Sequence, residues 1–119
     1  MTLKRILLAD DEETIRFIIR LNLGNRFEIV EATDGEDAWQ KFLAAQGNFD
    51  LVIADLKMPR LAGDELVAQI QRKRPQTPAI LLTGLLEPTL APRPNLSILT
   101  KPFDNGQLVA TVQQLLQEK

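Results

Sequence analysis

Residues 51–54 form an unbroken apolar run, Leu-Val-Ile-Ala, which stops at Asp55 and is followed by Met58 and Pro59. A run of this length with β-branched residues is typical of a strand buried on both faces, as in a parallel sheet. Proline cannot donate to a strand ladder, so the strand must end before Pro59. Asp55 is therefore expected at the carboxyl end of a strand, the edge where open parallel sheets bind ligands. Taken alone, it could equally be a turn or cap residue.

The rest of the chain alternates between two kinds of segment. Apolar strands are expected at residues 4–9, 78–83 and 96–100, in addition to the run before Asp55, and residues 27–32 alternate enough to be a further strand. Helices with one apolar face are expected at residues 14–23, after the turn at Asp34 and Gly35, from Gly63 to residue 74, and at residues 104–117. Strands that alternate with helices imply right-handed crossovers and a parallel sheet covered on both faces. At 119 residues, the whole chain (1–119) is expected to be one α/β domain.

Residues 85–95 do not follow this alternation. Pro88, Pro92 and Pro94 are too closely spaced for a normal helix, because each lacks an N–H donor and restricts the residue before it. The segment before the last strand is therefore expected to be a shortened or irregular helix.

The composition excludes several kinds of site. The chain has no cysteine and no histidine, which removes disulfides, thiolate and imidazole metal ligands, and histidine bases or phosphoacceptors. A net charge of −2 provides no basic field for phosphate backbones, so nucleic-acid binding by this domain is not expected. No apolar run approaches membrane-spanning length and no signal sequence precedes the first strand, so a cytoplasmic location is expected.

Polar side chains follow four of the five expected strands. Asp10 and Asp11 follow the first, Asp55 the third, Thr83 the fourth and Lys101 the fifth. Each has an ordinary interpretation as a helix cap, a strand-end hydroxyl or a surface amine. Because the carboxyl ends of parallel strands share one edge of a sheet, all five residues are expected to meet there, and coincidence explains the whole set poorly.

These residue types together favour phosphoryl chemistry. Clustered carboxylates suit a hard cation such as Mg²⁺, and Lys101 adds a second positive charge. Cation and ammonium can hold a phosphoryl group while Asp55, at the centre of the edge, attacks it. The Thr83 hydroxyl and the backbone amides of Lys57 and Gly84 can donate hydrogen bonds to the phosphoryl oxygens.

Four short segments carry a specific resemblance to a known family. They are Leu7 to Glu12, Asp55 to Pro59 with Gly63, Thr83-Gly84, and Lys101-Pro102-Phe103. In these segments, and over essentially its whole length, the chain resembles the receiver domain of bacterial two-component response regulators.

The resemblance implies both a fold and a function. The fold would be a flavodoxin-like (CheY-like) three-layer sandwich with a five-stranded parallel sheet in the order 2-1-3-4-5. The function would be a phosphorylation-switched signalling domain, in which Asp55 takes a phosphoryl group from a partner histidine kinase or histidine phosphotransfer protein. A downstream effector protein or a fused output domain would receive the signal. Such a domain is not an enzyme, since its phosphotransfer and autodephosphorylation are self-directed.

The resemblance also implies roles for single residues. Asp11 and Asp55 would bind Mg²⁺ (or Mn²⁺) directly, with the backbone carbonyl of Lys57 as a third ligand and Asp10 acting through water. Lys101 would pair with the phosphoryl group.

The sequence around Lys101 both follows the family and departs from it. The resemblance implies a cis bond between Lys101 and Pro102, which would hold the amine over the edge of the sheet. Three residues before the lysine, the family usually has a tyrosine or phenylalanine that rotates as a switch, and here that position is Ile98. Ile98 cannot bury a phenol ring. The stretch from Thr83 to Lys101 is also shorter than usual, so we expect the output surface to differ from the family pattern.

Two alternatives use a similar fold. A phosphohydrolase of the haloacid dehalogenase type also combines Asp, Ser or Thr, Lys and Mg²⁺, but such enzymes generally carry an aspartate where this chain has Lys57. A flavodoxin-like flavin binder would need aromatic rings around the flavin. This chain has no tyrosine, and its single tryptophan, Trp39, falls within an expected helix.

Overall fold

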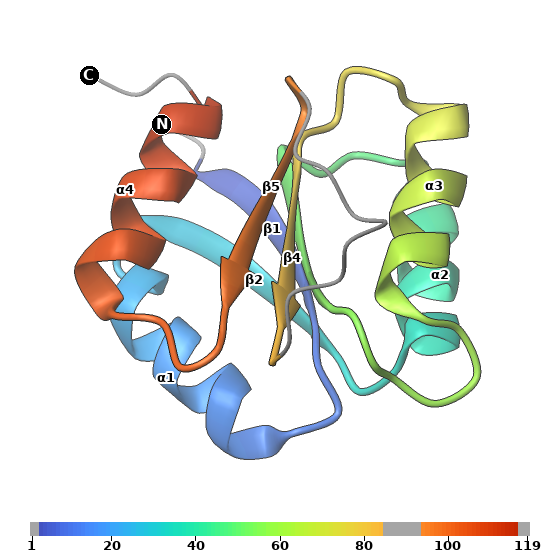
Figure 1. Cartoon of the computed structure of the whole chain (residues 1–119). Helices are drawn as coiled ribbons and strands as arrows, with labels where there is room; N and C mark the ends of the chain where they lie inside the picture. Colours follow the sequence, from blue (N-terminus) through green and yellow to red (C-terminus); the bar gives the residue numbers. More distant parts are fainter. Residues whose placement is uncertain (1–2, 85–93, 117–119) are drawn as a thin grey trace.

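The computed structural model describes residues 3–84 and 94–116 (Figure 1). Within these ranges the chain forms five strands: β1 (Lys4–Ala9), β2 (Phe27–Ala32), β3 (Leu51–Asp55), β4 (Ala79–Thr83) and β5 (Leu96–Thr100). The same ranges contain four helices: α1 (Glu13–Leu23), α2 (Gly35–Ala44), α3 (Gly63–Lys73) and α4 (Asn105–Leu116). The predicted irregular helix, with its three prolines, lies largely outside the described residues.

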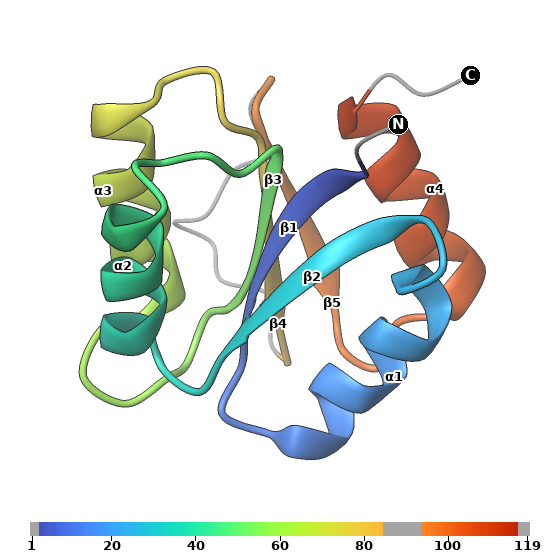
Figure 2. The same ribbon diagram turned by 180° about the vertical axis from the view of Figure 1, so that it is seen from behind.

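All five strands pair in parallel, in the order β2-β1-β3-β4-β5. Helices α1 and α4 cover one face of the sheet, and α2 and α3 cover the other (Figures 1 and 2). The predicted three-layer fold and its strand order are confirmed. Since β3 is the central strand, the residue at its carboxyl end lies in the middle of one edge of the sheet.

Alternate residues of each buried strand enter two different cores, as the period of a β-strand requires. In β1, Leu7 and Ala9 join the core under α2 and α3, while Ile6 and Leu8 join the core under α1 and α4. All four are fully buried. A strand between two cores has no polar face, which explains the continuous apolar runs in the sequence.

The helices bury the faces that their periodicity predicts. In α2, Ala38 and Phe42 are buried, and the Trp39 ring stacks on Phe42 with centroids 5.6 Å apart. Trp39 also packs against the core, whereas Leu43 is exposed. None of the described helices is long and apolar enough to cross a membrane.

Two glycines fix the loop between β3 and α3. A Cβ on Gly63 would lie 2.2 Å from the carbonyl oxygen of Asp55, and a Cβ on Gly35 would lie 1.9 Å from the carbonyl oxygen of Leu61. Only a residue without a side chain permits these approaches. The loop that follows Asp55 therefore lies directly against the beginning of α2.

An ion pair adds a second connection between this loop and α2. Arg60, which has a positive φ of 71°, places its Nε 3.1 Å from Asp34 Oδ2. The other oxygen of Asp34 caps α2 by accepting the Asp37 N–H at 2.7 Å. One carboxylate thus joins the helix terminus to the loop.

Candidate functional site

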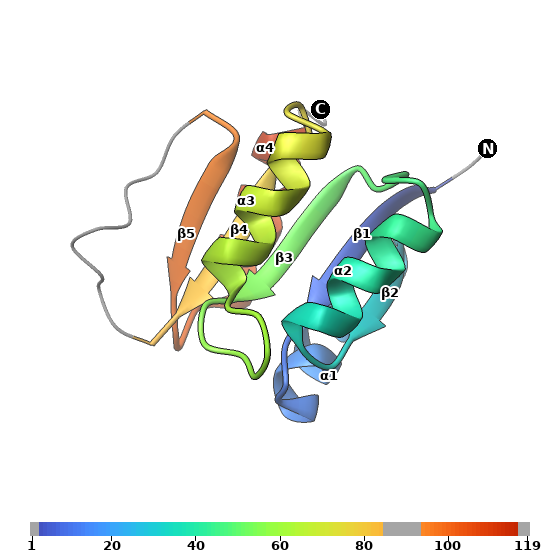
Figure 3. The same ribbon diagram turned by 90° about the vertical axis from the view of Figure 1, so that its right-hand side faces the viewer.

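Asp55 ends the central strand at the lower edge of the sheet in Figure 3. The next two backbone connections fix its position: the Leu56 N–H donates to Leu82 O at 2.8 Å, and the Gly63 N–H donates to Leu56 O at 2.9 Å. Asp55 is buried, and its carboxylate accepts a hydrogen bond from the backbone N–H of Lys57. These contacts hold the backbone around Asp55 in place at the edge of the sheet.

The loop after β1 brings a second buried carboxylate to the same edge. Asp10 is fully buried, and its Oδ1 accepts the Glu12 N–H at 2.8 Å. Its backbone carbonyl accepts a hydrogen bond from Arg16 Nη1 at 2.6 Å. Asp11, which lies between Asp10 and Glu12 in the chain, is exposed.

Lys101 directly follows the edge strand β5, and its side chain reaches both of these carboxylates. Its Nζ lies 3.4 Å from Asp10 Oδ2 and 3.3 Å from Asp55 Oδ2. Its backbone N–H donates to Thr83 O at 2.7 Å, which extends the β4–β5 ladder by one residue. The Lys101–Pro102 peptide bond is cis.

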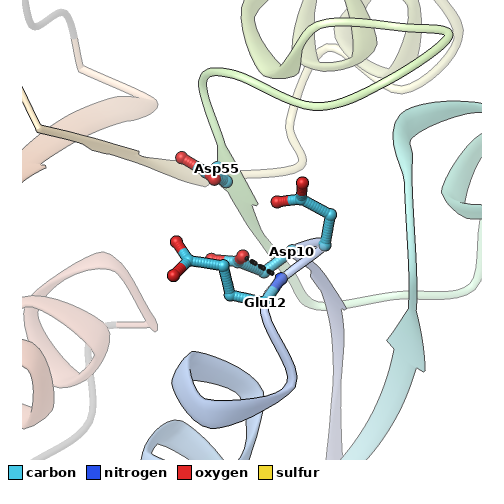
Figure 4. Close-up of side chains that lie close together, drawn as sticks. Asp10, Glu12 and Asp55 are labelled. Carbon is cyan, nitrogen blue, oxygen red and sulfur yellow. Dashed lines mark hydrogen bonds between the residues drawn. The ribbon is translucent and has the colours of Figure 1, made fainter.

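Glu12 also belongs to the cluster, although the sequence analysis gave it no role. Its Oε1 lies 3.3 Å from Lys101 Nζ. The only sequence signal was its place in an acidic run after the first strand. Figure 4 shows Asp10 and Glu12 on the loop after β1, close to Asp55 at the end of β3.

The cluster has the donor atoms that a hard cation needs. One carboxylate oxygen from each of four residues, Asp10, Asp11, Glu12 and Asp55, lies within 4.8 Å of the other three. Two of these side chains are exposed and two are buried, so an ion bound there could retain water ligands. Such a set fits Mg²⁺, which prefers a few carboxylates together with water.

Burial and charge both act on the titration of these groups. Desolvation raises the pKa of Asp10 to about 6, helped by the nearby charge of Asp55 and opposed by the Glu12 N–H and Lys101. Desolvation also raises the pKa of Asp55, against the lowering effect of the Lys101 ammonium. Partial burial disfavours the charge of Lys101, but the carboxylates of Asp10 and Asp55 outweigh it and hold its pKa above the usual value. Two negative charges therefore lie close together with one ammonium between them.

The other predicted residues lie on the neighbouring strands. Thr83 is buried at the end of β4, one residue beyond Leu82, which pairs with Asp55 on β3. Gly84 follows it, and among the described residues nothing lies within 4 Å of the position that its Cβ would take. Ile98 is half-buried on β5, where it pairs with Leu81 and packs against the core under α2 and α3. Leu81 and Thr83 point to the same face of β4, so Ile98 lies on the face that Thr83 uses.

A family model for the response regulator receiver domain matches residues 6–113. The transcriptional regulatory protein SrrA of Staphylococcus aureus is 34% identical over 116 residues, which cover 93% of this chain and 47% of SrrA. The chain thus spans about half the length of the curated relatives it matches.

Solved structures give the same result. A response regulator receiver protein from Sinorhizobium medicae superimposes with a TM-score of 0.88 at 27% identity, covering 98% of this chain and 96% of that one. The receiver domain of the hybrid histidine kinase CckA does so with a TM-score of 0.81 at 32% identity, covering 95% and 99%. These matches give no support to the phosphohydrolase alternative.

Proposed function

Since the chain belongs to the response regulator receiver domain family and acts as a phosphorylation-switched domain of two-component signalling, we propose that Asp55 is its phosphoacceptor. One observation carries this proposal: the Asp55 carboxylate ends the central strand with the Lys101 ammonium 3.3 Å away. No other described carboxylate combines the centre of this edge with an ammonium contact. Residues 1–119 would form the receiver domain.

The proposed reaction is a transfer of one phosphoryl group. An Asp55 carboxylate oxygen attacks the phosphorus of a phosphohistidine, and a new O–P bond forms as the N–P bond breaks. The imidazole nitrogen of the donor keeps the bonding electron pair and takes a proton from solvent. Water later attacks the acyl phosphate and releases inorganic phosphate, so phosphotransfer and autodephosphorylation are both self-directed.

Lys101, Thr83 and two backbone amides would stabilise the transferred group. The Lys101 ammonium offsets the negative charge on the phosphoryl oxygens, and the Thr83 hydroxyl donates one hydrogen bond. The N–H of Lys57 already points at the Asp55 carboxylate, and Gly84 leaves room for an oxygen to approach its own N–H.

Asp11, Asp55 and the backbone carbonyl of Lys57 would hold Mg²⁺ or Mn²⁺, with Asp10 acting through water. The bound cation would supply neutralisation of charge at the phosphoryl oxygens. The four-carboxylate cluster supports this assignment, because it offers a hard cation one carboxylate oxygen from each of four residues.

The partners of the chain follow from the family role. Histidine kinases or histidine phosphotransfer proteins would supply the phosphoryl group, and an effector protein or a fused output domain would receive the signal. Ile98 would occupy the switch position without an aromatic ring. A cytoplasmic location remains a prediction.

Acetyl phosphate and Mg²⁺ test the phosphoacceptor by intact mass. Wild type should gain one phosphoryl group, Asp55→Asn should gain none, and the exposed control Asp64→Asn should behave as wild type. Equal modification of wild type and Asp55→Asn would overturn the assignment.

A further inference from the structure

Lys101 has three hydrogen-bond donors and three carboxylates around it. Its Nζ lies 3.4 Å from Asp10 Oδ2 and 3.3 Å from both Glu12 Oε1 and Asp55 Oδ2. An ammonium group has three donors and no acceptor. Each donor of Lys101 therefore has a carboxylate within reach before any phosphoryl group arrives.

A phosphoryl group on Asp55 needs a donor from the same ammonium, so it competes with the carboxylates that already contact Lys101. Asp55 carries the phosphoryl group and stays in place. Asp10 is fully buried and held by the Glu12 N–H, and a buried carboxylate that loses its ionic partner is costly. The side chain of Glu12 is 59% exposed, so it can turn into water, where the loss of an ion pair costs little.

We propose that Glu12 is an electrostatic competitor of the incoming phosphoryl group for the Lys101 ammonium. Its carboxylate holds the Lys101 ammonium beside Asp55 in the unphosphorylated protein and yields that donor to the incoming phosphoryl group. This inference rests on the proposed role of Asp55. The backbone N–H of Glu12 anchors Asp10 whatever its own side chain does, so the side chain can move while the loop after β1 keeps its shape.

This arrangement makes Glu12 a competitor of the phosphodonor. Both present anionic oxygens to one ammonium, and the like charge of Glu12 also repels the donor. Removal of the Glu12 charge should therefore strengthen donor binding and leave the maximal rate of the chemical step nearly unchanged.

Glu12→Gln and Glu13→Gln form a matched pair for the test. Both remove one negative charge from adjacent exposed positions, but Glu13 makes no contact with Lys101 in the described part of the chain. The rate of mass gain is measured over a range of acetyl phosphate concentrations at saturating Mg²⁺. For Glu12→Gln the half-saturating concentration should fall about two- to fivefold, as expected for loss of one exposed charge contact. The maximal rate should stay within about twofold, and Glu13→Gln should resemble wild type on both measures.

Three results would overturn the inference. Identical kinetics of the two variants would show that the Glu12 contact with Lys101 has no role. A more than tenfold loss of Mg²⁺ affinity in Glu12→Gln alone, measured by titration, would make Glu12 a metal ligand instead. If wild type gains no phosphoryl group, both the proposed function and this inference are wrong. If wild type is phosphorylated and Glu12→Gln has the same kinetics as wild type, only the inference about Glu12 is wrong.

Discussion

Lys101 is the residue on which the electrostatics of the site depends. It is the single ammonium in contact with the described cluster, and it lies between two carboxylates whose pKa values are raised by burial. Without it, Asp10 and Asp55 would repel one another across a partly dehydrated space. Its charge also competes with any cation for the same oxygens.

Lys101→Ala should therefore affect metal and phosphoryl binding in opposite directions. Mg²⁺ affinity should stay the same or rise, because a competing cation is removed. The response to the phosphoryl mimic beryllofluoride should be impaired, since the phosphoryl group loses its ammonium partner. Mg²⁺ titration and amide chemical shifts measure the two effects, and a large loss of Mg²⁺ affinity would contradict the prediction.

Ionisation of the buried Asp10 should make the folded protein less stable as pH rises. Burial raises the pKa of Asp10 from the ordinary value of 3.8 to about 6 in the folded protein, so the folded state binds more protons than the unfolded state between these values. The free energy of unfolding should therefore fall as pH rises from about 4 to about 7 without metal. With chelator present, Asp10→Asn should be more stable than wild type at pH 7.5 by about 1–3 kcal/mol, and the difference should vanish near pH 4. Urea unfolding checks this, and a less stable Asn variant at pH 7.5 would contradict it.

Among the elements, the strands were the most predictable. β1 and β2 have the bounds predicted from the sequence, because the apolar run that ends at Ala9 and the alternating segment from Phe27 to Ala32 are both typical of strands. Helix α1 begins one residue earlier than predicted, at Glu13, and its cap residue makes no side-chain hydrogen bond. A helix terminus without a capping side chain leaves little mark on a sequence.

The site was predictable only in part. Its position follows from strand order, since residues at the carboxyl ends of neighbouring strands must meet. The contact between Glu12 and Lys101 depends on the reach and rotamer of two flexible side chains, which spacing does not encode. The ion pair of Arg60 with Asp34 was also not predicted. It depends on the close approach of the loop after Asp55 to the beginning of α2 at Gly35, which residue spacing does not encode.

Gly35→Ala should show how closely α2 and the loop after Asp55 pack. The new Cβ would lie 1.9 Å from the Leu61 carbonyl oxygen, so either the helix or the loop must shift. We expect a loss of about 1–3 kcal/mol in the free energy of unfolding, as for other overpacked sites. Gly84→Ala, where the described structure leaves open space, is the control and should change stability much less. Equal stabilities of the two variants would contradict the described packing.

The switch should act through β4 and β5. Thr83 and Ile98 share one face of these strands, and Ile98 has few stiff rotamers with which to follow the threonine. On addition of beryllofluoride, the largest amide shifts outside the loops around Asp55 should fall at Gly84 and residues 95–99. If those amides stay constant while the body of α1 shifts, the signal leaves through the opposite face.

At the scale of the whole molecule, the sheet separates two cores that share no side chain among the described residues. Each strand contributes alternate residues to the two cores. A shift of side chains in one core therefore displaces the strand and changes the packing in the other core. The loops at the carboxyl edge lie where both cores end. A change at Asp55 can therefore reach either pair of helices through the same strands.

Lys101 Nζ lies 3.4 Å from Asp10 Oδ2, although the two residues are 91 positions apart in the chain. An unfolded chain cannot bring them together, so whatever binds at this edge binds the folded state alone. By thermodynamic linkage, free Mg²⁺ at 100 times its dissociation constant should raise the free energy of unfolding by about 2.7 kcal/mol. Chelation should lower the melting temperature of wild type, and Asp55→Ala should lose most of this dependence; a melting temperature indifferent to Mg²⁺ would contradict it. Cation binding at the signalling site and the folding of the domain are thus linked equilibria.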